Sequence, residues 1–98
     1  MSCAAPVGGA PLTTAIGTQA VIEGTVSRDG AGVGGAYVRL LDASGEFTAE
    51  VPTDDAGSFR FFARPGEWTL RTLVPRSSSV DLGVSAEAGQ ITTVTVTV

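Results

Sequence analysis

The chain has 98 residues, enough for one domain with a single core and too few for two. Ten carboxylates against six arginines, with no lysine or histidine, give a net charge of -4. This excludes the clustered basic surface that binds a nucleic-acid backbone, so we expect no nucleic-acid partner. The segment after Met1 lacks the features of a signal peptide, and no apolar run could span a bilayer. We expect a cytoplasmic protein without membrane association.

The absence of histidine removes two groups of enzymes. A Ser-His-Asp triad uses histidine as its general base, and zinc peptidases use it as a ligand. Cys3 is the only thiol, so no internal disulfide can form. We therefore expect a non-catalytic protein that holds no cofactor and no metal.

Residues 1–18 consist mainly of alanine, glycine, proline, threonine and serine, without helical or strand periodicity. Such a segment buries too little apolar surface to offset the entropy of ordering it. We expect a flexible tail over residues 1–18 and one folded domain over residues 19–98.

Short alternating segments begin at Gln19 and recur to the end of the chain. Turn residues separate them, such as Asp29-Gly30 and Pro65-Gly66, where glycine accepts a positive φ. Seven strands are expected, over about residues 19–27, 36–41, 46–51, 58–62, 68–74, 80–84 and 92–98. The chain is therefore predicted to be an all-β, seven-stranded Greek-key sandwich.

Alternation along these strands assigns the large apolar side chains to the core. Phe59 and Phe61 face inward in the fourth strand, and Trp68 and Leu70 do so in the fifth. Burial of these rings and of the leucine would supply much of the apolar area that the fold needs.

In two of the expected strands, the alternation of inward and outward residues needs comment. The third strand places Phe47 on one face with Ala49 and Val51. Ile91 is out of phase with the valines of the last strand, so either that strand begins at Thr92 or a bulge shifts its register.

Four segments carry a resemblance to a known fold family, namely residues 24–26, 35–40, 53–61 and 65–70. Their turn and core residues are similar to those of the carboxypeptidase regulatory-like domain, a transthyretin-type β-sandwich. The resemblance covers most of the chain and implies a fold. It implies little about activity, because one fold serves many functions.

A closer resemblance lies in residues 38–42, 45–51 and 59–63. They are similar to a small bacterial family of uncharacterised single-domain proteins, associated with sulfur metabolism and typically encoded beside a rhodanese-type thiosulfate sulfurtransferase. The resemblance implies an accessory role in sulfur metabolism with that enzyme as partner. Members usually carry a cysteine directly after the initiator methionine, whereas here Ser2 intervenes and the thiol is Cys3.

Cys3 is open to two interpretations. A mobile thiol could accept sulfane sulfur and hand it on, which would make the chain a sulfur-relay or redox protein. The nearest basic residue in the sequence is Arg28, and no helix N-terminus is expected near the tail to favour the thiolate. The other interpretation is an incidental tail cysteine.

One outer sheet face gathers aromatic, charged and leucine side chains. It forms if strands 36–41, 46–51 and 68–74 are neighbours, as in a transthyretin-type arrangement. Its residues are Tyr37, Arg39, Leu41, Glu46, Glu50, Arg71 and Leu73. Such a face is either a solvated ladder of weak ion pairs or a surface for a protein partner or for self-association, since interfaces favour arginine and aromatic residues.

The aspartates suggest a calcium site, because hard cations bind carboxylate oxygens that loops bring together. The candidates are the Asp54-Asp55 pair, with Asp29 and Asp81 elsewhere. No loop shows regular ligand spacing, and a Thr-Asp-x-x-Gly turn uses its aspartate to accept backbone hydrogen bonds. We interpret the pair as turn residues.

The favoured hypothesis is a non-catalytic binding or scaffold module that acts through the outer sheet face, with a sulfurtransferase as its partner. The alternative is a sulfur relay in which the sandwich docks and the tail presents Cys3.

Overall fold

The computed structural model describes residues 19–98. They form eight strands and no helix, so this part of the chain contains no helix that could cross a membrane. The strands are β1 (Ala20–Arg28), β2 (Ala31–Gly32), β3 (Tyr37–Leu41), β4 (Phe47–Pro52), β5 (Ser58–Ala63), β6 (Gly66–Leu73), β7 (Val80–Ala86) and β8 (Ile91–Thr97). The all-β prediction is confirmed. The prediction of a flexible tail falls on residues 1–18, outside the described residues.

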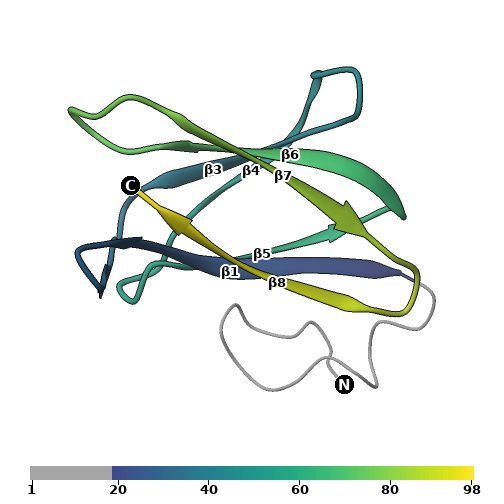
Figure 1. The fold of residues 1–98 in the computed structure, drawn as a ribbon, viewed down its shortest axis with the longest axis horizontal. Coiled ribbons are helices and arrows are strands. Elements are labelled where there is room, and N and C mark those ends of the chain that lie inside the picture. Colours follow the sequence, from purple (N-terminus) through teal and green to yellow (C-terminus); the bar gives the residue numbers. More distant parts are fainter. Residues whose placement is uncertain (1–18) are drawn as a thin grey trace.

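Two sheets pack face to face in a sandwich (Figure 1). In the first, which we call the β1 sheet, β1 lies between antiparallel β5 and parallel β8, and β2 pairs with its end. The second, the β3 sheet, is antiparallel in the order β4-β3-β6-β7. The three strands predicted to be neighbours, β4, β3 and β6, are adjacent in this order.

The additional strand, β2, has only two residues and forms a hairpin with the end of β1. Asp29 and Gly30 connect the two strands, with φ of 53° and 82°. Positive φ at both central residues is typical of the two-residue hairpin turn that suits twisted strands. The turn was predicted, but the short strand after it was not.

The core between the sheets is built from alternating side chains of both. Phe59 and Phe61 of β5 and Trp68 and Leu70 of β6 are buried in it, as predicted. The Trp68 indole N–H donates to the carbonyl oxygen of Arg64 at 2.8 Å, so the one polar group of this ring is satisfied. The aromatic residues of the β5–β6 segment are therefore mainly architectural.

The turn before β5 is held by the side chain of Asp54. Its Oδ1 accepts hydrogen bonds from the backbone N–H groups of Ala56 at 2.9 Å and Ser58 at 2.8 Å. Gly57, with φ of 85°, takes a left-handed conformation that glycine adopts without steric cost. The interpretation of Asp54 as a turn residue is confirmed.

The turn between β3 and β4 has the same design, with Asp42 in the same role. Its Oδ1 accepts from the Ser44 backbone N–H at 2.9 Å, the Ser44 hydroxyl at 2.6 Å and the Glu46 N–H at 2.9 Å. These bonds favour the charged carboxylate, and the Ser44 hydroxyl contributes most to lowering the pKa of Asp42 below its usual value.

The end of β3 departs from simple alternation. The β3–β4 register shifts so that Leu40 pairs with Ala49 and Leu41 pairs with Phe47, which leaves Thr48 as an extra residue in β4. Two predictions are wrong for this reason. Leu41, expected at the surface, is buried, and Phe47, expected on the face of Ala49, is 59% exposed.

The last strand, β8, starts at Ile91 and runs parallel to β1 without a break in register. Ile91 pairs with Val21, whereas Val96 packs on the core. Because neighbouring residues point to opposite faces, Ile91 simply belongs to the face that Val96 does not use. Neither the later start at Thr92 nor the bulge that we considered occurs.

The approach of β8 to β1 requires Gly24. A Cβ built there would collide with the carbonyl oxygen of Val94 and lie 3.0 Å from Cζ of Phe59. A glycine inside a strand usually weakens it and often marks a close backbone approach. Here the missing side chain allows β8 to lie against β1 and leaves room for the Phe59 ring next to Gly24.

Candidate functional site

The outer face of the β3 sheet carries a row of four charged residues, one from each strand. Arg39 of β3 is opposite Glu50 of β4 on one side and Arg71 of β6 on the other. Arg71 is in turn opposite Asp81 of β7. The row reads Glu50, Arg39, Arg71, Asp81, so its charges balance and each arginine has a carboxylate beside it.

Both arginines of this row are engaged and accessible. Arg39 Nε lies 2.7 Å from Glu50 Oε2. Arg71 binds Asp81 through two bonds, with Nε–Oδ1 at 2.9 Å and Nη2–Oδ2 at 3.0 Å. The Arg71 hydrogen bond lowers the pKa of Asp81, and the bond to Asp81 raises the pKa of Arg71. Exposed pairs of this kind contribute little to stability.

Two large aromatic residues flank the row. Tyr37 and Phe47 are 49% and 59% exposed. The guanidinium carbon of Arg39 lies 5.7 Å from the centroid of the Phe47 ring, within the range of a cation–π contact. Tyr37 is opposite the half-buried Leu73 of β6. We call this surface the arginine face, defined by Tyr37, Arg39, Phe47, Glu50, Arg71, Leu73 and Asp81.

Most of the residues predicted for this surface come together on it, with two exceptions. Leu41 is buried. Glu46 lies in the turn before β4, beyond the charged row, where its backbone N–H bonds Asp42. Cys3, which was predicted separately as a sulfur acceptor, lies outside the described residues.

Two members of the arginine face were missed in the sequence. Phe47 was assigned to the other face because the bulge in β4 leaves no clear mark on the residue pattern. Asp81 could have been found, because it alternates with Val80 and Leu82 and so faces away from the core.

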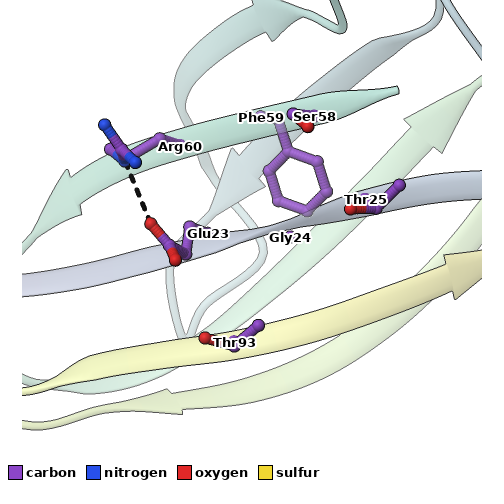
Figure 2. A pocket seen from close by; sticks show the side chains of 7 residues that line it. All are labelled: Glu23, Gly24, Thr25, Ser58, Phe59, Arg60 and Thr93. Atoms are coloured by element: carbon purple, nitrogen blue, oxygen red, sulfur yellow. Dashed lines mark hydrogen bonds and ion pairs between the residues drawn. The ribbon is translucent and has the colours of Figure 1, made fainter. Parts of the chain in front are cut away.

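The outer face of the β1 sheet differs, and its main feature is a shallow hollow (Figure 2). The hollow is lined by polar side chains of β1, β5 and β8 around the Glu23–Arg60 ion pair, in which Nε and Oε1 are 3.1 Å apart. In Figure 2, Thr25 lies further along β1 from Glu23, and Thr93 lies on the neighbouring strand β8. Its volume is about 190 Å³.

This hollow is a weak candidate for a ligand site. Small-molecule sites usually measure about 300–1,000 Å³ and are mainly apolar. The Glu23 and Arg60 charges already neutralise each other. Residues 19–98 also contain no group of three or more acidic, histidine or cysteine side chains arranged to hold a metal ion.

Comparison with known proteins identifies relatives of unknown function. The sequence model of a family described as "Protein of unknown function (DUF1416)" matches residues 3–98. Two uncharacterised proteins of Mycobacterium tuberculosis, Rv0814c and Rv3118, are 53% identical over 74 residues, which cover 72% of this chain and 74% of each relative. An uncharacterised protein of Mycolicibacterium smegmatis is 61% identical over 57 residues, 56% of this chain and 62% of the relative.

Solved structures with a similar fold belong to another family. A DUF3823 protein of Parabacteroides merdae aligns with a TM-score of 0.56 and 17% identity, over 82% of this chain and 45% of that one. A DUF3823 protein of Bacteroides ovatus aligns with a TM-score of 0.53 and 18% identity, over 81% of this chain and 43% of that one. This chain spans less than half of either protein, and the likeness concerns the fold alone.

Proposed function

The chain belongs to DUF1416, a family of unknown function, and from this premise we propose that it is a non-catalytic protein-binding module that docks through the arginine face. The observation that carries the proposal is the exposure of Tyr37 and Phe47 beside Arg39 and Arg71. Aromatic and arginine side chains are enriched in protein interfaces, and tyrosine and arginine are enriched among the residues that contribute most of the binding energy.

The charged row suits docking because its ion pairs are already formed. Arg39 and Arg71 are held by their carboxylates, so binding orders few additional side chains. A partner can place an apolar group against Tyr37 and Phe47 while the row supplies a polar rim. The face therefore combines preorganised charge with apolar contact area.

The partner that we propose is a rhodanese-type thiosulfate sulfurtransferase, which makes the protein an accessory of cytoplasmic sulfur metabolism. The support is the resemblance to sulfur-metabolism-associated proteins encoded beside that enzyme. A domain that only docks onto an enzyme requires no catalytic residues of its own.

A binding measurement with purified sulfurtransferase tests this proposal. The double variant Tyr37→Ala/Phe47→Ala should weaken binding by a factor of about 30, as expected for loss of hot-spot aromatic contacts. Phe62→Ala is the matched control, because Phe62 is as exposed as Tyr37 (48% against 49%) but lies on the β1 sheet. Equal losses in both variants, or no loss in the double variant, contradict the docking face.

Sedimentation velocity of the chain alone separates partner binding from self-association. If the arginine face joins two copies, the unmodified chain sediments as a dimer and the double variant as a monomer. That result contradicts the sulfurtransferase as the occupant of the face. Absence of any binding by the unmodified chain contradicts the choice of partner.

The alternative function is sulfur relay by Cys3, and the observation that favours it is the family match, which begins at residue 3. The Cys3 thiolate would attack the outer sulfur of a persulfide on the sulfurtransferase. A new S–S bond forms on Cys3, the donor S–S bond breaks, and the donor leaves as a thiolate that takes up the proton released by Cys3. Mass spectrometry after incubation with the enzyme and thiosulfate should show a gain of one sulfur atom, which Cys3→Ala abolishes. No gain contradicts the relay.

We also assign the sandwich to the carboxypeptidase regulatory-like, transthyretin-type fold with Greek-key connections. The adjacency of β4, β3 and β6 and the turn at Asp54 support this assignment. An experimental structure whose strand order differs from that of solved members of this fold would contradict it.

A further inference from the structure

A pocket lies at the end of the sandwich where β5 connects to β6. This connection is on the right in Figure 1. Its volume is about 420 Å³, within the usual range for small-molecule sites of about 300–1,000 Å³. We call it the end pocket. Its walls include Leu40, Phe62, Pro65 and Trp68. Its polar residues are Gln19, Thr48 and Arg64.

The β4 bulge contributes to one side of the end pocket. Thr48, the extra residue in β4, lines the pocket next to the buried Leu40. A bulge of this kind bends a strand and redirects its side chains, and bulges are frequent beside functional sites. The same irregularity that exposes Phe47 on the arginine face therefore also supplies a hydroxyl to this pocket.

The aromatic walls of the end pocket differ in exposure. Trp68 is 8% exposed, and its indole is fixed by the 2.8 Å bond from Nε1 to the carbonyl oxygen of Arg64. Phe62 is 48% exposed, so a large apolar ring stands in water beside the pocket. A planar apolar molecule in the pocket would cover the Phe62 ring without disturbing the Trp68 hydrogen bond.

Charge at the end pocket comes from Arg64 alone among the described residues that line it. The Arg64 side chain makes no hydrogen bond or ion pair with residues 19–98. In this respect Arg64, which lies between β5 and β6, differs from the arginines within β3, β5 and β6. In a chain with ten carboxylates and six arginines, an arginine without a carboxylate beside an apolar pocket favours an anionic ligand.

We propose that the end pocket binds a small aromatic carboxylate. The ring lies against Phe62 and Trp68, and the carboxylate accepts hydrogen bonds from the Arg64 guanidinium, whose planar fork matches a carboxylate. This site is separate from the arginine face, and the proposal does not depend on docking of a partner.

The fluorescence of Trp68, the only tryptophan of the chain, reports on this pocket directly. Titration of the full chain with 1-naphthoate should change its emission in a saturable way. The Arg64→Gln variant should bind at least about tenfold more weakly, as expected for loss of a charge-assisted hydrogen bond. The neutral probe 1-naphthamide lacks the carboxylate that Arg64 would bind. Its affinity for the unmodified chain should therefore be no higher than the affinity of 1-naphthoate for Arg64→Gln.

Two variants complete the experiment. Arg76→Gln is the matched control, because Arg76 also has no ion pair within residues 19–98 but lies in the β6–β7 connection, away from the pocket. It should leave the affinity unchanged. Phe62→Ala should weaken binding of both probes. Absence of a saturable change, or equal affinities of the unmodified chain and Arg64→Gln for 1-naphthoate, overturns the proposal.

Discussion

The two outer faces of this sandwich use the same kinds of residue in opposite ways. On the arginine face, the side chains of Arg39 and Arg71 are 46% and 44% exposed, and two aromatic rings stand beside them. On the β1 sheet, the Arg60 side chain is only 7% exposed and is bound to Glu23 among threonines. An arginine whose side chain is nearly buried serves the fold, whereas one that stays accessible is available to a partner.

The largest expected effect tests how tightly the β1 sheet is packed. Gly24→Ala should lower the free energy of unfolding by about 3 kcal/mol, because the added Cβ collides with the carbonyl oxygen of Val94 and cannot be accommodated without moving β8. Gly83→Ala on β7 is the matched control. No atom lies within 4 Å of a Cβ built there, so its effect should stay within about 0.5 kcal/mol. Urea denaturation measures both, and equal effects would contradict the difference in packing.

A second comparison concerns two buried threonines, Thr53 just after β4 and Thr72 within β6. The Thr53 hydroxyl accepts from the Ala36 N–H at 3.0 Å and donates to the Val33 carbonyl oxygen at 2.7 Å. Thr53→Val leaves these buried groups without their partner and should cost about 2 kcal/mol. Thr72 is buried and its hydroxyl has no partner within residues 19–98.

Thr72→Val should therefore leave the stability unchanged or raise it by up to about 1 kcal/mol, since the isosteric valine removes a hydroxyl that gains nothing in the core. Thermal unfolding of Thr53→Val and Thr72→Val in parallel measures the two effects on stability. A loss from Thr72→Val as large as that from Thr53→Val would show that the Thr72 hydroxyl is satisfied after all.

A third test contrasts the ion pairs of the two faces. Glu23→Gln weakens the pair with the nearly buried Arg60 and should cost about 1 kcal/mol, a value reduced because Glu23 itself is partly exposed. Glu50→Gln on the arginine face should cost about 0.3 kcal/mol. Added salt should reduce the second effect more than the first. A larger loss of stability from Glu50→Gln than from Glu23→Gln would contradict the conclusion that the Glu23–Arg60 pair serves the fold and the Arg39–Glu50 pair does not.

The smallest expected effect is a dependence on pH from the exposed pair of Arg71 and Asp81. The pKa of Asp81 is lower in the folded chain than its usual value of 3.8. The unfolded chain therefore binds the proton more tightly, and the resulting stabilisation is present above about pH 4 and lost as the pH falls through the folded pKa. Arg71→Gln should lose less stability between pH 6 and pH 3 than the unmodified chain. An identical loss in chemical denaturation would contradict this sign.

Turn chemistry and alternation made much of this fold predictable. Asp54 and Gly57 predicted a turn that the structure contains. Trp68 alternates in step with Leu70, and this correctly placed it in the core. These features depend on neighbouring residues in the chain, so the sequence records them. The grouping of Arg39 and Arg71 followed from the expected strand order.

The remaining differences arise from contacts between strands. The extra residue at Thr48 and the burial of Leu41 depend on how β4 pairs with β3, and a bulge needs no special residue type. The end pocket depends on the same bulge together with the β5–β6 turn, so only the assembled sandwich reveals it. The ion pair of Asp81 likewise required knowledge that β7 lies beside β6.

The most direct test of the docking face is a map of backbone amide shifts by NMR as purified sulfurtransferase is added to the labelled chain. We predict shifts concentrated in β3, β4 and β6 around Tyr37, Arg39 and Arg71, with those of β1, β5 and β8 nearly unchanged. Shifts concentrated in β1, β5 and β8, or no shifts at saturating enzyme, would contradict it.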